Sequence, residues 1–324
     1  MLRIIYMGTP QFAVPGLEAL IAGSKPGQVL QEGYDIVTVI TRPDKPSGRG
    51  KEIIYSPVKQ LALSHDILVW QPGSLKRQEN IDALAAFQAD LFIVAAFGQI
   101  LPQAVLDLPR YGTLNIHASL LPKYRSVSPI SKSILQGDKE TGVTIMLIDA
   151  GVDTGSILLQ HMIPIDEDDT TGSLTSKLAV LGASALVEAL PLWVQGKITP
   201  KPQDERYASY THMLHKEDGK IDWSHPADVL ARTVRAFTPW PGAYTNWGDR
   251  FLKIISAHPV QSSTNVEASV GTVGLSKENG MQILTITTGN GLLAIKKLQL
   301  EGKKVMNADE FLRGHTQIVG EVLG

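Results

Sequence analysis

Short apolar runs alternate with helical patterns through the first half of the chain. In several runs nearly every position is apolar, which predicts strands buried on both faces, as in a parallel sheet. Strands are predicted at residues 3–7, 36–41, 67–69, 91–96, 113–116 and 143–148. Because helical segments separate these strands, the pattern predicts an α/β fold with a doubly wound, mostly parallel sheet.

Residues that favour helix starts stand where the helical patterns begin. Pro10, with Thr9 as N-cap, predicts a helix over 10–22, and Ser56 followed by Pro57 begins another. Thr170 or Thr171 can cap a long helix that should pack on the sheet through one apolar stripe. This stripe consists of Leu174, Leu178, Leu181, Ala185, Ala189 and Leu192.

The composition changes after the long helix. Residues 196–209 are polar and contain prolines, which is typical of a connection between domains. A helical piece at 226–237 then precedes short β runs, which predict a small β-barrel. These runs are 243–247, 251–257, 271–274, 282–287 and 292–298, with a hairpin signal at Gly289-Asn290-Gly291. We therefore expect a first domain over 1–195, a linker over 196–209 and a second domain over 210–324.

Length and composition limit the class of protein. The chain has 324 residues, 43% of them hydrophobic, which suits two globular domains. It has no cysteine, so disulfides, thiolate catalysis and thiolate zinc sites are excluded. A net charge of −2 argues against indiscriminate coating of nucleic acid, although a local basic patch can still bind phosphates. The apolar runs are far shorter than the roughly 20 residues of a membrane helix, so we expect a cytoplasmic protein without a membrane span.

An amide, an imidazole and a carboxylate follow two of the predicted strands. Asn115 and His117 are two residues apart in an extended segment, so their side chains share one face. Asp153 follows roughly one strand-helix unit later, and Asp149 is a competing carboxylate. Singly, such residues are often structural, but these should converge where an open α/β sheet binds ligands. Together they suit acyl transfer to an amine, with groups to stabilise the oxyanion, accept the amine proton and orient the imidazole.

A cationic loop follows the strand at 36–41. Its prolines and glycines exclude a helix or a central strand, and it carries Arg42, Lys45, Arg49 and Lys51 against the single Asp44. A solvated surface loop and a phosphate-binding loop both fit this composition. Its place at the carboxyl end of a strand favours phosphate binding.

The loop over 97–101 also follows a buried strand. Unpaired backbone groups there suit a flat heterocycle such as a pterin, with Ile100 and Leu101 as apolar walls, although ordinary loop packing is the alternative.

Two other kinds of binding site are not indicated by the sequence. The first strand ends with Gly8 and lacks the three glycines of a dinucleotide site. His212 and His215 have no third ligand at suitable spacing, so no metal site is expected.

Taken together, these segments resemble the folate-dependent formyltransferases, and within them the enzymes that act on initiator tRNA. The resemblance covers essentially the whole chain and includes residues 115–122, 149–155 and 97–101, with 221–223, 235–237 and 239–241 in the second domain. It implies a Rossmann-like catalytic domain followed by an OB-like, tRNA-binding β-barrel. It also implies 10-formyltetrahydrofolate as the formyl donor and the α-amine of methionyl initiator tRNA as the acceptor.

Site roles follow from the resemblance position by position. Asn115, His117 and Asp153 would be the catalytic residues, and Arg42 with Lys45, Arg49 and Lys51 would contact tRNA. The folate site would be lined by Phe97, Gly98, Gln99, Ile100, Leu101, Ser119, Leu120, Leu121 and Pro122. Further phosphate contacts are expected from Arg250, Lys253, Lys296, Lys297, Lys303 and Lys304. The protein is expected to be a monomer without a metal ion.

One segment departs from the pattern of the tRNA enzymes. Where these enzymes usually have Arg-Gly-Ala-Ala-Pro-Ile, this chain has Arg125-Ser126-Val127-Ser128-Pro129-Ile130. The larger side chains add volume and hydroxyls near the expected acceptor pocket, which predicts reduced or altered activity.

Two other functions stay open at this stage. A folate-dependent formyltransferase that acts on an amino sugar or another small amine would use the same catalytic residues. The altered 126–128 segment is also compatible with a non-catalytic RNA- or folate-binding protein. Formyl transfer to charged tRNA separates the three.

Overall fold

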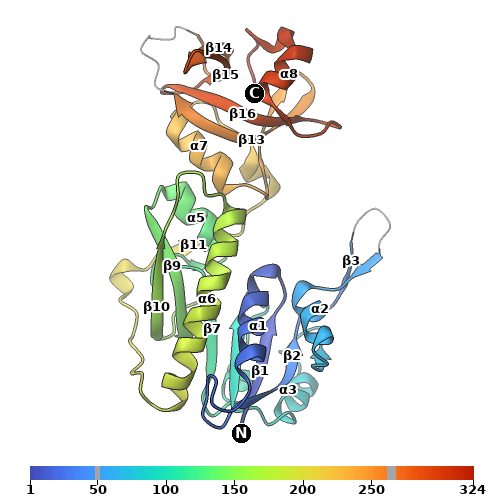
Figure 1. Ribbon diagram of the computed structural model, residues 1–324, viewed down its shortest axis with the longest axis vertical. Coiled ribbons are helices and arrows are strands. Elements are labelled where there is room, and N and C mark those ends of the chain that lie inside the picture. The colour runs from blue at the N-terminus through green and yellow to red at the C-terminus, as the bar shows by residue number, and fades with distance from the viewer. Residues whose placement is uncertain (48–51, 261–267) are drawn as a thin grey trace. The chain divides into compact units, whose positions relative to one another are not determined.

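The computed structural model describes residues 1–47, 52–260 and 268–324 (Figure 1). These residues form two compact units. The first contains residues 1–129, 140–164 and 175–211, and the second contains 130–139, 165–174 and 212–324. Two short segments that precede the predicted linker, 130–139 and 165–174, thus group with the C-terminal unit.

A seven-stranded sheet forms the centre of the first unit, in the order β10-β9-β7-β6-β1-β2-β5. The pairings from β7 to β5 are parallel, whereas β9 and β10 run antiparallel. The mostly parallel sheet is therefore confirmed, but β9 has the opposite direction and β10 lacks a counterpart among the predicted strands. The bounds are β1 Leu2–Gly8, β2 Tyr34–Ile40, β5 Val69–Trp70, β6 Leu91–Ala95, β7 Thr113–His117, β9 Glu140–Leu147 and β10 Ile157–Pro164.

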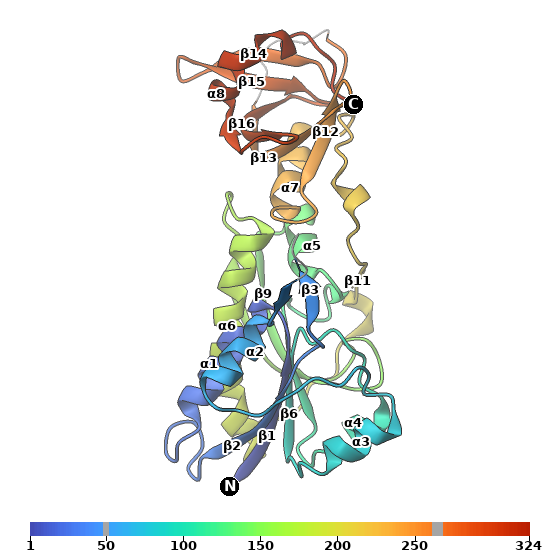
Figure 2. The same cartoon turned by 90° about the vertical axis from the view of Figure 1, so that its right-hand side faces the viewer.

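Helices cover both faces of this sheet. In Figure 2, α1 and α6 lie on one side, and α3 and α4 lie on the other. Ser56 caps α2, because its hydroxyl accepts from the Lys59 amide at 3.2 Å. Thr9 is not an N-cap: its Oγ1 accepts from the Arg42 amide at 3.1 Å, and a 3₁₀ turn at Gln11–Ala13 precedes α1. The bounds are α1 Val14–Gly23, α2 Pro57–Ser64, α3 Gln78–Ala85, α4 Gln103–Leu106 and α6 Thr171–Val194.

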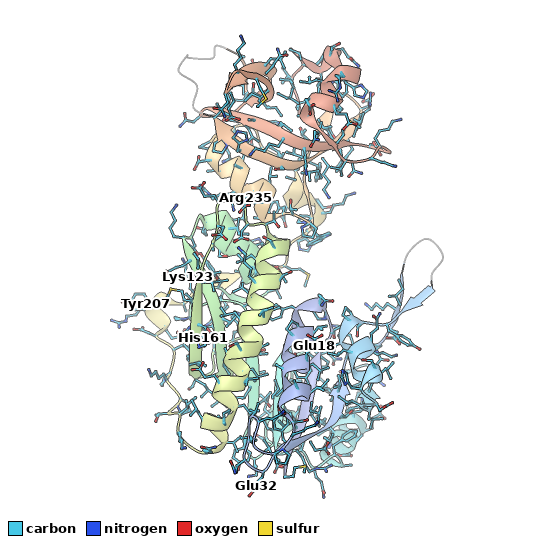
Figure 3. The ribbon with its side chains drawn as sticks, viewed as in Figure 1. Glu18, Glu32, Lys123, His161, Tyr207 and Arg235 are labelled. Carbon is cyan, nitrogen blue, oxygen red and sulfur yellow. The ribbon has the colours of Figure 1, made fainter. Side chains whose placement is uncertain are left out.

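Helix α6 is long and apolar enough to cross a membrane by length and composition. In this chain it packs on the sheet, because Leu178, Ala185 and Ala189 of its stripe are buried. A Cβ at Gly182 would come within 2.6 Å of Ile116, so the helix needs a glycine where it crosses β7. At the sheet edge, His161 of β10, which is labelled in Figure 3, pairs with Glu188 of α6 at 3.0 Å. The helix is therefore a core helix.

The C-terminal unit is an antiparallel sheet packed with two helices. Its core includes Trp223, Val234, Ile254 and Leu293. Gly289-Asn290-Gly291 connects β15 to β16, as predicted. The strands pair in the order β12-β13-β16-β15-β14, and the C-terminal residues bridge the two edge strands: the Val273 amide of β14 donates to the Glu321 carbonyl at 2.8 Å, and the Asn246 amide of β12 donates to the Gly324 carbonyl at 3.3 Å. The bounds are β12 Ala243–Trp247, β13 Arg250–Val260, β14 Val273–Glu278, β15 Met281–Thr287, β16 Leu292–Leu300, β17 Met306–Asn307, α5 Pro129–Gln136, α7 Ala227–Ala236 and α8 Ala308–Gly314.

Candidate active site

Strand β7 presents Asn115 and His117 on one face of the sheet. Ile116 between them is buried on the opposite face, close to Gly16 of α1 and Gly182 of α6. Because side chains alternate along a strand, Asn115 and His117 point away from these helices. The carboxyl ends of β1, β6 and β7 lie together, since Gly8 pairs with Ala95 and Val94 pairs with Asn115.

His117 is held on both sides of its ring. Its Nε2 lies 3.0 Å from the carbonyl oxygen of Tyr124, and its Nδ1 lies 3.6 Å from Oδ2 of Asp153. The His117 side chain is 7% exposed and that of Asp153 is 19% exposed. A carbonyl only accepts hydrogen bonds, so we assign a proton to Nε2. Nδ1 then carries the lone pair of the neutral ring, and it faces the Asp153 carboxylate.

Asp153 reaches His117 by a different route from the one that a parallel sheet predicts. Strand β9 is antiparallel to β7, with Leu147 opposite Leu114, so the following loop starts beside the first residues of β7. The loop turns back along the strand to bring Asp153 to His117. A Cβ at Gly155 would come within 1.8 Å of the Leu147 carbonyl oxygen, so this return requires a glycine there.

The competing carboxylate, Asp149, stabilises the turn in which it lies. Asp149 is exposed, and its Oδ1 accepts from the Gly151 amide at 3.0 Å and the Thr154 hydroxyl at 2.6 Å. The structure therefore pairs Asp153, rather than Asp149, with the imidazole.

The loop after β6 lies beside the end of β7, because Val94 pairs with Asn115. Ile100 is 69% exposed, whereas Phe97 and Leu101 are buried. The Gln99 side chain turns away to Leu75 and Pro72 at 3.2 Å each. Among the described residues, no backbone hydrogen bond forms at Gln99, Ile100 or Leu101. These free amides and carbonyls, with Ile100, are suitable for a flat polar heterocycle such as a pteridine.

The segment after His117 is fixed by hydrogen bonds. Ser119 is fully buried, and its hydroxyl donates to the Lys123 carbonyl at 2.7 Å. Thr144 of β9 donates to the Ser119 carbonyl at 2.6 Å and accepts from the Leu121 amide at 3.1 Å. Leu121 is buried, while Leu120 and Pro122 are partly exposed. The side chains of Ser119 and Leu121 thus support the segment, and Leu120 and Pro122 are the ones that can contact a ligand.

Arg42 joins the cationic loop to the loop after β6. Its guanidinium donates to the Gly98 carbonyl, and its own carbonyl accepts from Gln71 at 2.7 Å. Lys59 pairs with Asp44. Burial would raise the pKa of Asp44, but hydrogen bonds from Lys59 and Gln71 and the Lys59 charge hold this pKa below its ordinary value.

The cationic residues of this loop differ in how far the structure describes them. Arg42 and Lys45 are exposed, and Lys45 begins the short β3 Lys45–Ser47, which pairs with β4 Glu52–Ile54. Arg49 and Lys51 lie outside the described residues.

A buried arginine beside Asp153 was not found by sequence reasoning as a candidate residue. Arg125 is fully buried, and its guanidinium donates to both carboxylate oxygens of Glu205, at 2.9 and 2.6 Å, and to the Tyr210 hydroxyl at 2.8 Å. Arg125–Ser126 form β8, which pairs in parallel with β11 Tyr210–Thr211. The bond to Glu205 raises the pKa of Arg125 and lowers that of Glu205. The sequence gives no signal for this role, because the partners of Arg125 are about 80 positions away.

The departure at Ser126 imposes backbone strain. Ser126 has a φ of 79°, in the left-handed region where the tRNA enzymes usually have glycine. Its amide donates to Asp153 Oδ2 at 2.8 Å, so this backbone position is set by the site. The positive φ is therefore maintained against the preference of a serine.

Ser126→Gly should raise the free energy of unfolding by about 0.5–1 kcal/mol, because removal of the left-handed penalty outweighs the greater entropy of unfolded glycine. Urea unfolding measures this change. Ser126→Ala is the matched control and should give no gain, since it loses the hydroxyl but keeps the Cβ. Equal stabilisation by both variants would assign the effect to the hydroxyl instead.

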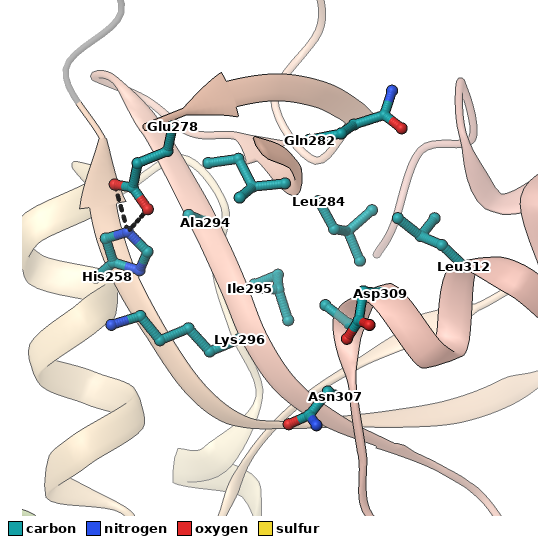
Figure 4. Close-up of a pocket in the computed structure, with 12 residues that line it drawn as sticks. His258, Glu278, Gln282, Leu284, Ala294, Ile295, Lys296, Asn307, Asp309 and Leu312 are labelled. Atoms are coloured by element: carbon teal, nitrogen blue, oxygen red, sulfur yellow. Dashed lines mark hydrogen bonds and ion pairs between the residues drawn. The ribbon is translucent and has the colours of Figure 1, made fainter. Parts of the chain in front are cut away.

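A separate cavity of about 270 Å³ lies in the C-terminal unit (Figure 4). Its apolar lining includes Leu284 and Leu312, and at its rim His258 pairs with Glu278 at 2.9 Å. It contains none of the predicted catalytic residues. In the part of the chain that the structure describes, no three His, Asp or Glu side chains gather as metal ligands.

An imidazole–carboxylate pair thus lies at the end of a central strand of a doubly wound sheet, beside a loop with free backbone groups. The chain belongs to the formyl transferase family: residues 2–190 match the formyl transferase model, and residues 213–316 match that of the formyl transferase C-terminal domain.

Its relatives include the methionyl-tRNA formyltransferase of Thiobacillus denitrificans, 46% identical over 323 residues that cover 100% of both chains. That of Marinobacter nauticus is 44% identical over 318 residues, which cover 98% of each.

Solved structures of lower identity share the fold. A sugar 3N-formyl transferase, in the presence of dTDP and 5-N-formyl-THF, has a TM-score of 0.63 at 21% identity and covers 94% of this chain and 99% of that one. The N-formyltransferase from Helicobacter canadensis, in complex with folinic acid and dTDP-3-aminofucose, has a TM-score of 0.62 at 20% identity and covers 91% and 98%. At these identities the likeness concerns the fold alone.

Proposed function

We propose that this protein transfers the formyl group of 10-formyltetrahydrofolate to the α-amine of methionyl initiator tRNA and so supports the initiation of translation. The observation that carries the proposal is the His117–Asp153 pair at the end of β7, in a chain that matches methionyl-tRNA formyltransferases from end to end. The reaction is placed in the cytoplasm, with the protein as a monomer of 35.1 kDa.

The chemistry follows from the groups on β7 and its neighbours. The amine nitrogen attacks the formyl carbon and forms the new C–N bond. The Asn115 amide donates to the oxyanion that develops on the formyl oxygen. His117 accepts the amine proton at Nδ1, and Asp153 stabilises the protonated ring. The bond between the formyl carbon and N10 then breaks, N10 takes a proton, and tetrahydrofolate leaves.

Folate binding is assigned to the loop after β6 and to the segment after His117. The free backbone groups of residues 99–101 would pair with the polar edge of the pteridine, with Ile100 as an apolar wall. Of the segment after His117, Leu120 and Pro122 are partly exposed and would add apolar contact. Gly98 needs no side chain here: its φ of 76° suits glycine, and its carbonyl holds Arg42.

Binding of tRNA is assigned to exposed cationic side chains. In the first unit these are Arg42 and Lys45. In the second unit Lys253 is partly buried, and the exposed ones are Arg250, Lys296, Lys297, Lys303 and Lys304. Because such contacts release counterions from the phosphates, tRNA affinity should fall steeply with salt.

A single-turnover assay tests the proposed function. The protein is mixed with radiolabelled 10-formyltetrahydrofolate and one of three acceptors: methionyl initiator tRNA, a nucleotide-linked amino sugar, or none. We expect label on the methionine α-amine only. Transfer to the amino sugar alone would favour the sugar-modifying alternative, and no transfer would favour a binding protein.

Arg42→Leu should raise the KM for methionyl initiator tRNA about tenfold, because one cationic contact with the RNA is lost. The KM for the formyl donor should change by less than about threefold, since Gly98 loses a partner but its loop keeps Gln99 in place. Steady-state kinetics with each substrate varied measure both values. Arg77→Leu, at an exposed arginine, is the matched control. An equal rise in both KM values would contradict the tRNA role.

A further inference from the structure

Gln203 connects the buried Arg125 to the loop that carries Asp153. Its Oε1 accepts from Nε of Arg125 at 3.0 Å. Its Nε2 donates to the carbonyl oxygens of Asp153 and Gly155, both at 2.8 Å. Composition alone assigns Gln203 to an interdomain linker, but these contacts place it within the first unit.

The orientation of the Gln203 amide is fixed by chemistry. A guanidinium only donates hydrogen bonds and a carbonyl only accepts them, so the oxygen of the amide must face Arg125 and the nitrogen must face the loop. Arg125 itself is oriented by the two bonds to Glu205 and the bond to Tyr210. The amide therefore has one arrangement that satisfies all of its neighbours.

Asp153 is held at two points. Its carbonyl oxygen accepts from Gln203, and its Oδ2 accepts from the amide of Ser126, the residue after Arg125. Its φ of 53° lies in the left-handed region, which a residue other than glycine keeps only where neighbours impose it. Both contacts that impose it lead back to Arg125, one through a side chain and one along the backbone.

We infer that Gln203 is a positioning residue for the proposed formyl transfer, and that it fixes the backbone of Asp153 so that the carboxylate faces Nδ1 of His117. Gln203 acts through Asp153, at the backbone rather than at the carboxylate. The rate consequence of this inference rests on the proposed function, whereas its structural consequence does not.

Two near-isosteric variants test the inference. Gln203→Glu keeps an oxygen for Arg125 but cannot donate to the two carbonyls, and Gln203→Leu loses both sets of bonds. Each should lower kcat about tenfold, because the carboxylate is displaced, while the KM for the formyl donor stays within about twofold. Gln78→Leu is the matched control: Gln78 is exposed and bonds only to Asp82 at 2.8 Å among the described residues, so kcat should not change.

Measurements in the Asp153→Asn variant distinguish a positioning role of Gln203 from general structural damage. In Asp153→Asn, the group that Gln203 is proposed to position has lost its charge, so adding Gln203→Glu should cost less than about twofold further. A full tenfold loss in that background would overturn the inference, since the effect would not pass through Asp153.

Hydrogen exchange gives a readout that does not depend on activity. Gln203→Leu should speed exchange of peptides that contain Ser126 and residues 149–156, while Gln78→Leu should not. Unchanged exchange in Gln203→Leu would overturn the inference. If the wild type transfers no formyl group and exchange still rises in Gln203→Leu, the proposed function fails and the positioning of Asp153 by Gln203 stands.

Discussion

His117→Ala should lower the single-turnover rate of formyl transfer to methionyl initiator tRNA about 1,000-fold. The variant removes the imidazole whose Nδ1 lies 3.6 Å from Asp153, and with it the proposed acceptor of the amine proton. Its bond to the Tyr124 carbonyl is also lost, but that bond serves orientation. Rapid-quench measurement of labelled formylmethionyl-tRNA gives the rate directly.

His65→Ala is the matched control for this variant. His65 is exposed at the end of α2, away from β7 in the sequence and the sheet order, and its replacement should leave the rate unchanged. Asp153→Asn should be less severe than His117→Ala, at about 100-fold, because the amide keeps the bond from Ser126 but loses the charge. A His117→Ala rate within a few-fold of wild type would remove His117 from the chemistry.

Arg125→Met should lower the free energy of unfolding by about 3 kcal/mol, because Gln203, Glu205 and Tyr210 all lose a charged hydrogen-bond donor. This value lies at the lower end of the destabilisation expected when one partner of a buried ion pair is removed, because the Glu205 side chain is 69% exposed and can be rehydrated. Urea unfolding at neutral pH measures the change. Arg77→Met, whose arginine is 73% exposed beside Glu79, should change stability by less than about 0.5 kcal/mol.

The destabilisation should also depend on pH. Arg125 lowers the pKa of Glu205 by its hydrogen bond, against a smaller opposing effect of desolvation. A carboxyl with a lowered folded pKa stabilises the fold above its unfolded pKa, and this contribution is lost as pH falls through the folded value. The difference between wild type and Arg125→Met should therefore shrink below about pH 4. A difference that grows in acid would contradict the assignment of Glu205 as the main partner.

Much of the first unit could be predicted because buried parallel strands leave a strong local signal. The run at β6 is wholly apolar and that at β1 mostly so, and the predicted bounds of β1, β6 and β7 agree with the structure to within a residue or two. Strand β10 was missed because it is an edge strand with alternating exposure and polar residues such as Gln160 and His161. The direction of β9 relative to β7 could not be predicted from the local sequence pattern, since an antiparallel neighbour of β7 has the same apolar run as a parallel one.

The candidate site divides in the same way. Asn115 and His117 share a strand, so a period of two was enough to place them together. The return of the 148–156 loop over β7 and the contacts of Gln203 with Asp153 and Arg125 join residues 50 and 78 positions apart. Such contacts leave no periodic signal, and polar residues such as Gln203 and Glu205 read as a solvated linker until the fold brings Arg125 to them.

The central claim is that His117 and Asp153 act as one unit in formyl transfer to charged initiator tRNA. The most direct test is the single-turnover rate of wild type, His117→Ala, Asp153→Asn and the double variant with methionyl initiator tRNA. We predict that the wild type formylates the methionine α-amine and that the double variant is within about twofold of His117→Ala. A wild type that makes no formylmethionyl-tRNA, or single losses that multiply in the double variant, would contradict the claim.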